Sequence, residues 1–185
     1  MTRVVWVFGL LAGAVLAVMM VINIAFIDRI GFDTAEIIGY TTMVIAFLMV
    51  FFGIRSYRDN IYGGAISFGR AVGVGLLITL VASVCYVTTW EVIYYWLAPD
   101  FVDKYGAYML QQAREAGATE QELAEKAAEM ARFREMYRNP LVNAGITFVE
   151  VFPIGAVVTL ISAAILRRGR KAANGSPMTV PSATR

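Results

Sequence analysis

Residues 4–27 read VVWVFGLLAGAVLAVMMVINIAFI, a run of 24 residues between Arg3 and Asp28 that contains no charge. A helix needs roughly 20 predominantly apolar residues to cross a hydrocarbon layer about 30 Å thick. The run is therefore long enough for one transmembrane helix. The rest of the chain has the same character, since 58% of its residues are hydrophobic and only 16% are charged. This composition is too apolar for an ordinary soluble domain of 185 residues.

Three further segments match this first span, and we expect them at 37–54, 69–97 and 141–166. The longest uncharged stretches in the second and third segments are 18 and 20 residues. The fourth segment carries a single charge, Glu150. The sequence therefore predicts an all-α membrane protein with four transmembrane helices.

A cleaved signal peptide is the alternative interpretation of the N-terminus. Arg3 precedes the apolar run, and Ala12-Gly13-Ala14 resembles a small-residue cleavage site. The run stays apolar from Val15 to Ile27, where a signal peptide would become polar. We therefore expect a first membrane span.

The basic residues near the predicted spans indicate an orientation. One side collects most of them against the single acid Asp59: Arg3, Arg55, Arg58, Arg70, Arg167, Arg168, Arg170 and Lys171. Loops on the other side are acidic on balance. Because Lys and Arg are retained on the cytoplasmic side, we expect both termini in the cytoplasm.

Residues 99–139 are rich in Ala, Glu, Gln and Arg, and they predict an outer helical hairpin between the third and fourth spans. The first helix is expected over Phe101 to Glu115 and the second from Thr119 to about Arg138, with Gly117 as the break. Thr119 and Glu122 have the spacing of a capping box. An apolar stripe is expected on the second helix at Leu123, Ala127, Met130, Phe133 and Tyr137.

Two interpretations of this hairpin stay open. It is either a solvated unit that stabilises itself or a docking surface for an envelope partner. The hairpin and the four spans are expected to form a single domain over 1–170. The polar residues 171–185 predict a disordered cytoplasmic tail.

Signatures of catalysis or cofactor binding are absent from the sequence. It has no histidine and one cysteine, Cys85, within an apolar span. Neither a catalytic site nor a metal or cofactor is predicted, and an intramembrane enzyme is the weakest functional alternative. The pairs Gly9 with Gly13 and Gly69 with Gly73 instead have the spacing of close helix packing in membranes.

A candidate polar site lies within the spans. Its members are Glu150, Glu91, Asn23 and Asn143, each of which needs a partner where water is absent. Without a basic residue inside any span, Glu150 is expected as a neutral acid that is hydrogen-bonded to Asn23, Thr88 or Thr89. Its role is either structural or the movement of a proton, an ion or a ligand. Glu91 is more consistent with an interfacial position.

A characteristic stretch, GIRSYRD at 53–59, is followed by Gly63-Gly64 and by Ile66-Ser67-Phe68. With Gly73, Ser83 and Tyr86, this pattern resembles the bacterial membrane family catalogued as domain of unknown function 4199. The resemblance implies a four-helix bacterial membrane protein, and we therefore expect a multi-pass protein of the bacterial cytoplasmic (inner) membrane. It supplies no activity.

The same stretch suggests contacts with the membrane surface. Arg55 and Arg58 would lie at lipid phosphates, Asp59 would hold one of them, and Ser67 would cap the next helix. Recognition of an anionic ligand is the alternative. The full set of candidate phosphate contacts is Arg55, Arg58, Arg70, Arg167 and Arg168.

Two classes of function remain after these exclusions. The first is a non-enzymatic scaffold or accessory component of the envelope that packs with itself or with another envelope protein. The second is a small oligomeric transporter or proton-linked channel that uses Glu150. The lipid bilayer is the expected environment, and no nucleic-acid partner is predicted.

Overall fold

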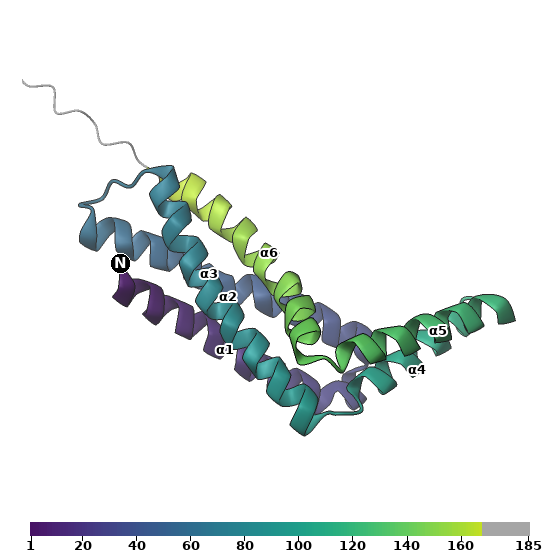
Figure 1. The fold of residues 1–185 in the computed structure, drawn as a ribbon. Helices are drawn as coiled ribbons and strands as arrows, with labels where there is room; N and C mark the ends of the chain where they lie inside the picture. The colour runs from purple at the N-terminus through teal and green to yellow at the C-terminus, as the bar shows by residue number, and fades with distance from the viewer. Residues whose placement is uncertain (168–185) are drawn as a thin grey trace, which may run out of the picture.

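The computed structural model describes residues 1–167, which are helical apart from short connections (Figure 1). Four of the helices are long and apolar enough to cross a membrane. This result confirms the predicted all-helical class with four long apolar helices. The elements are α1 (Thr2–Ile30), α2 (Phe32–Ile61), α3 (Phe68–Val92) with the π-helical turn η1 (Ile93–Leu97), α4 (Phe101–Glu115), α5 (Glu120–Tyr137) and α6 (Pro140–Leu166).

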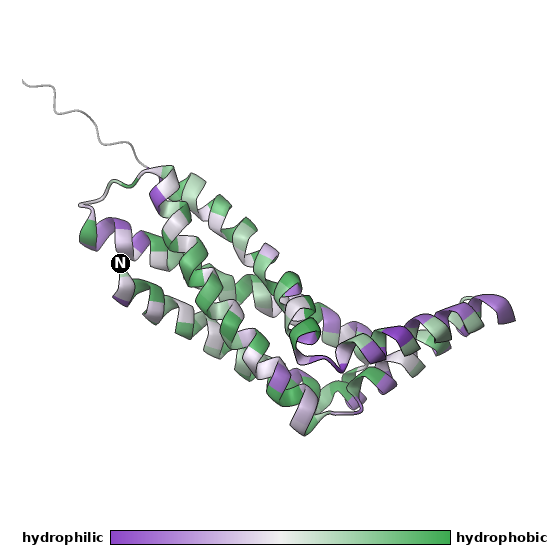
Figure 2. Cartoon of the chain, viewed as in Figure 1, coloured by the Kyte–Doolittle hydropathy of each residue, from purple (hydrophilic) through white to green (hydrophobic). Residues whose placement is uncertain are grey.

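The long helices form a bundle in which α1 and α6 each pack against both α2 and α3. Helices α2 and α3 also touch across the middle. The N-terminus, the α2–α3 connection and the end of α6 lie at one end of the bundle, and α4 and α5 project from the other end (Figure 1). Polar colour concentrates on α4, α5 and the connections, while the bundle surface is largely apolar (Figure 2). An apolar outer surface is typical of helices in lipid.

Glycines bring α3 close to α1. A Cβ placed on Gly9 would lie 2.7 Å from the Cβ of Val81, and one on Gly13 would lie 2.6 Å from the Cβ of Cys85. The first predicted glycine pair is therefore confirmed as a packing surface. The prediction that Gly69 and Gly73 form a second packing surface is wrong, because a Cβ on either residue would have no neighbouring atom within 4 Å.

The packing of α3 against α6 uses two glycines that lie outside the two predicted glycine pairs. A Cβ on Gly75 would lie 2.5 Å from Thr159 Cγ2, and one on Gly155 would collide with Thr79 and Phe47. At this crossing the Thr79 and Thr159 hydroxyls form a buried hydrogen bond of 3.1 Å. Small side chains and one interhelical hydrogen bond thus hold the two helices together.

Helix α2 is longer than its predicted span. It begins directly after Gly31, whose φ of 77° permits α1 and α2 to be joined by one residue. At its other end it continues to Ile61, so Arg55 to Asp59 are helical and not part of a loop. The turn falls at Gly63 and Gly64, both with positive φ. Ser67 occupies the N-cap of α3 without a capping hydrogen bond from its side chain.

Helices α4 and α5 run antiparallel beside each other. Arg134 pairs with Asp103 at 3.0 Å, and Gly106 faces Met130. At the start of α5 the backbone N–H of Thr119 donates to Glu122 Oε2 at 2.7 Å and its hydroxyl donates at 2.9 Å. These bonds lower the pKa of the Glu122 carboxyl.

Most of the expected apolar stripe on α5 is buried or half-buried. Its exception is Ala127, which is exposed. The stripe is therefore narrower than the sequence predicts. The predicted tail at 171–185 lies outside the described residues.

The glycine contacts lead to a matched pair of substitutions. Gly13→Ala should lower the free energy of unfolding by about 1–3 kcal/mol, because the new methyl group overlaps Cys85. Gly73→Ala should leave it unchanged or raise it by up to about 1 kcal/mol, because the methyl group meets open space and alanine favours the helix. Thermal unfolding in detergent measures both variants. Equal stability of the two would contradict close α1–α3 packing.

Candidate functional site

A cavity of about 360 Å³ lies at the end of the bundle from which α4 and α5 project. Every helix from α1 to α6 contributes to its wall. Its volume is within the range of small-molecule sites. The wall combines eight aromatic residues with two carboxylates, Glu36 and Glu150.

The cavity opens between α2 and α6. Of the residues that line it, four are exposed: Glu36, Tyr40, Ile146 and Glu150. The first two are on α2 and the others on α6, whereas the lining residues of the other helices are buried or half-buried. Both carboxylates therefore lie at the mouth.

Packed side chains close the opposite end of the cavity. Phe47 of α2 lies against Gly155 of α6, where a Cβ would meet the phenyl ring. Beyond this contact Val50, Ile54 and Ile78 are fully buried. The interior between this level and the α2–α3 turn is therefore closely packed, mostly by apolar residues together with the hydrogen-bonded Thr79 and Thr159.

Aromatic contacts seat α4 over the cavity. Phe32, at the start of α2, packs against Phe101, Tyr105 and Tyr108 of α4 with ring centroids 5.8, 5.6 and 5.0 Å away. A hydrogen bond from Tyr108 to Asp33 adds a polar link and raises the pKa of Tyr108 to about 12. Helix α4 is thus attached to α2 by both apolar and polar contacts.

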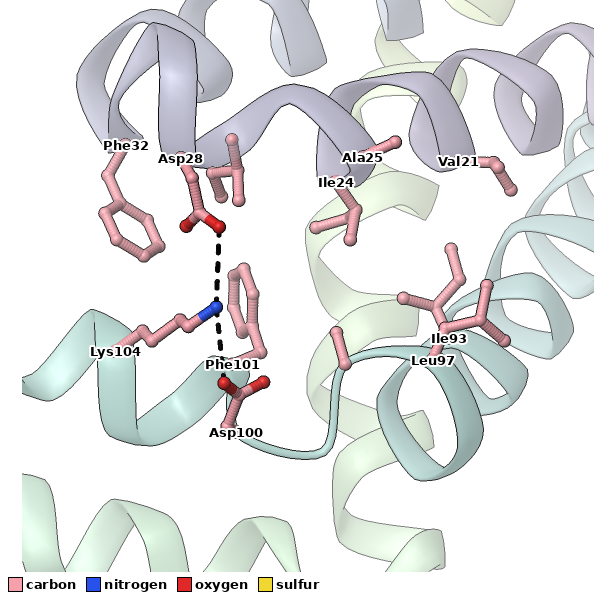
Figure 3. A pocket seen from close by; sticks show the side chains of 12 residues that line it. Val21, Ile24, Ala25, Asp28, Phe32, Ile93, Leu97, Asp100, Phe101 and Lys104 are labelled. Carbon is pink, nitrogen blue, oxygen red and sulfur yellow. Dashed lines mark ion pairs between the residues drawn. The ribbon is translucent and has the colours of Figure 1, made fainter.

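A second cavity of about 330 Å³ adjoins the first and is bounded by α1, the start of α2, η1 and α4. Figure 3 shows Lys104 of α4 reaching between Asp28 of α1 and Asp100, at 3.6 and 3.2 Å. Its hydrogen bond with Asp100 and the two nearby carboxylates raise the pKa of Lys104. The ammonium group is therefore already paired, and it ties α4 to the end of α1.

Asn143 is the most buried of the four predicted polar residues. It is 0% exposed, and its Oδ1 accepts a hydrogen bond from the Trp90 indole at 3.0 Å and a weaker one from Thr147 at 3.4 Å. Trp90 and Thr147 both line the larger cavity. Asn143 thus supports the cavity wall from behind.

Asn23 and Glu150 share the cavity but are not bonded to each other. The Asn23 amide donates to the Ala35 carbonyl at 2.7 Å, and its buried Oδ1 has no partner among residues 1–167. The prediction that Glu150 is hydrogen-bonded to Asn23, Thr88 or Thr89 is wrong. The two threonine hydroxyls donate to carbonyls of their own helix. Glu150 instead faces the cavity mouth.

Glu91 stands apart from this group. It is half-buried on α3 and is not among the residues that line the cavity. Within the described chain its Oε1 is buried without a hydrogen bond. The structure therefore brings together Asn23 and Glu150, supports them with Asn143, and leaves Glu91 outside.

The predicted phosphate-contacting arginines gather near the α2–α3 turn and the end of α6. Asp59 pairs with two of them, with Arg58 at 2.6 Å and with Arg55 at 3.7 Å. Arg70 lies over the Tyr62 ring at 4.5 Å. Arg167 is exposed just after α6, and Arg168 lies outside the described residues.

A family model matches nearly the whole chain. The model described as Protein of unknown function (DUF4199) covers residues 7–168. The chain belongs to the DUF4199 family. Searches of curated proteins and of solved structures returned no match.

This DUF4199 member has site residues that the sequence analysis missed. Glu36 lies just before the predicted second span at 37–54, but in the structure it begins the second turn of α2 and reaches the cavity. Tyr40, Tyr86 and Tyr105 belong to three different helices. No sequence spacing connects residues so far apart, and only the packing of the helices identifies them as one site.

The Trp90–Asn143 hydrogen bond can be tested with a double-mutant cycle. Asn143→Leu removes the acceptor from a buried indole N–H and should lower the free energy of unfolding by about 1–2 kcal/mol. Trp90→Phe removes the donor, so the double variant should be less destabilised than the sum of the single variants. Strict additivity in detergent unfolding would show that the bond contributes nothing.

Proposed function

We propose that this chain is a four-span protein of the bacterial cytoplasmic membrane with a non-enzymatic accessory role. Both termini would lie in the cytoplasm, and α4 and α5 would lie on the opposite side. The four long apolar helices support insertion in lipid. The proposed unit is a single domain over 1–170.

The distribution of charge supports this orientation. Arg3, Arg55, Arg58, Arg70 and Arg167 all belong to the bundle end opposite α4 and α5. Retention of basic residues in the cytoplasm would place that end inside. The exposed arginines there would contact lipid phosphates.

The shape of the interior favours an accessory role over transport. The cavity lies at the α4–α5 end of the bundle and opens between α2 and α6, and fully buried side chains, most of them apolar, fill the interior toward the other end. A conducting path needs polar groups at successive depths across the membrane. One chain therefore offers a binding cavity and no path through its described residues.

Transport by an oligomer is the second candidate, and one observation favours it. Glu150 is exposed at the cavity mouth between α2 and α6. A second copy could face this surface and complete a path around the carboxylate. An intramembrane ionisable residue often marks such a route.

The orientation can be tested with single cysteines in a Cys85→Ala background. A cysteine at Asn60, near the α2–α3 turn, should resist a membrane-impermeant thiol reagent in intact cells. A cysteine at Ala116, between α4 and α5, should react. Both positions are exposed, so permeabilised cells should label both and serve as the control. The reverse pattern in intact cells would overturn the orientation.

Proton flux separates the two candidate functions. Vesicles containing the purified chain and a trapped pH-sensitive dye should equilibrate an imposed pH gradient no faster than protein-free vesicles. Glu150→Gln should behave in the same way, because no proton path depends on that carboxyl. Fast flux in the wild type that is abolished by Glu150→Gln would establish the transporter instead.

A further inference from the structure

We propose that the larger cavity binds an organic ammonium ion that carries an apolar body. This inference rests on the proposed membrane placement and names a ligand class for the accessory role. It follows from three features of the cavity: its unpaired acceptors, its aromatic wall and its sideways mouth.

The carboxylates of the cavity have no basic partner in its wall. Glu36 and Glu150 both face it, and no Lys or Arg is present among the described residues that line it. Lys104, which lines the adjoining cavity, is held by Asp28 and Asp100. Asn23 Oδ1 is a buried acceptor without a partner among residues 1–167. A ligand with a positive charge and N–H donors would supply the positive charge that the carboxylates lack and a donor for Asn23.

The aromatic wall favours an organic cation over a metal ion. Ring faces attract ammonium groups, and rings of Tyr40, Tyr86, Trp90, Tyr105 and Tyr137 line the space around the carboxylates. Among residues 1–167 no group of three or more His, Cys, Asp or Glu side chains is placed to hold a metal ion. The apolar residues between the rings would cover the body of the ligand.

The position of the mouth indicates an amphiphilic ligand. Glu36 lies four residues into α2 and Glu150 ten residues into α6, which corresponds to roughly 6 and 15 Å of helix rise. In the proposed orientation the opening between α2 and α6 therefore extends from the outer interface into the membrane. A molecule with an ammonium group and a hydrocarbon chain could enter from the outer leaflet without crossing water.

Decylammonium is a suitable probe, with decanol as its neutral counterpart. The full chain is placed in phosphatidylcholine nanodiscs, and bound probe is measured against empty nanodiscs. The wild type should bind decylammonium at about one site per chain and at least about tenfold more tightly than decanol. Glu36→Gln and Glu150→Gln should each weaken decylammonium binding by at least about tenfold, because each removes a charged acceptor.

Glu129→Gln is the matched control. It removes the same charge from an exposed position on α5 outside the cavity and should bind decylammonium as the wild type does. Equal binding of decanol, or unchanged decylammonium affinity in every folded cavity variant, would overturn the proposal. Melting temperatures identify a variant that does not fold. If either Glu36→Gln or Glu150→Gln fails to fold, decylammonium binding by the remaining one tests the proposal. Cysteine labelling at Asn60 and Ala116 tests the membrane placement separately, so the two proposals can fail independently.

Discussion

The close approach of α3 to its neighbours is the constraint on which the rest of the structure depends. Apolar helices in lipid gain little from the hydrophobic effect when they associate, so small residues must bring their backbones together. Gly9 and Gly13 of α1 allow α1 and α3 to approach closely. Gly75 of α3 and Gly155 of α6 do the same for α3 and α6. The Thr79–Thr159 hydrogen bond then fixes the α3–α6 crossing. With both sides of α3 tightly packed, one half of the bundle is a solid core.

The other half of the bundle is built differently. Large aromatic residues predominate in the cavity wall there, and α4 lies over the cavity. The Phe32 ring and the Lys104 ion pairs attach α4 to α2 and α1 from two sides. The cavity is therefore a consequence of the change from small to aromatic residues along the bundle. Behind this wall the buried Asn143 Oδ1 accepts a hydrogen bond from the Trp90 indole.

The candidate site was only partly visible in the sequence. Asn23, Asn143 and Glu150 stood out because a polar residue inside an apolar run is unusual in itself. Glu36 did not, because it lies outside the uncharged run and resembles an ordinary loop acid. The cavity tyrosines did not either, since a tyrosine near a membrane interface has a sufficient explanation there. Glu91 was selected on the same grounds as Glu150, yet it lies away from the cavity.

Sequence alone determined the four long helices, because the length of an apolar run and the absence of charge are local properties. The capping box at Thr119 and Glu122 was equally readable, since its partners are three residues apart. Tertiary structure decided which glycines pack: Gly13 and Gly73 lie in similar apolar runs, and only Gly13 faces another helix. It also decided that Glu36 and Glu150, 114 positions apart in the chain, share one cavity. The rotation of each helix about its axis sets both outcomes, and that rotation arises from contacts among all the helices together.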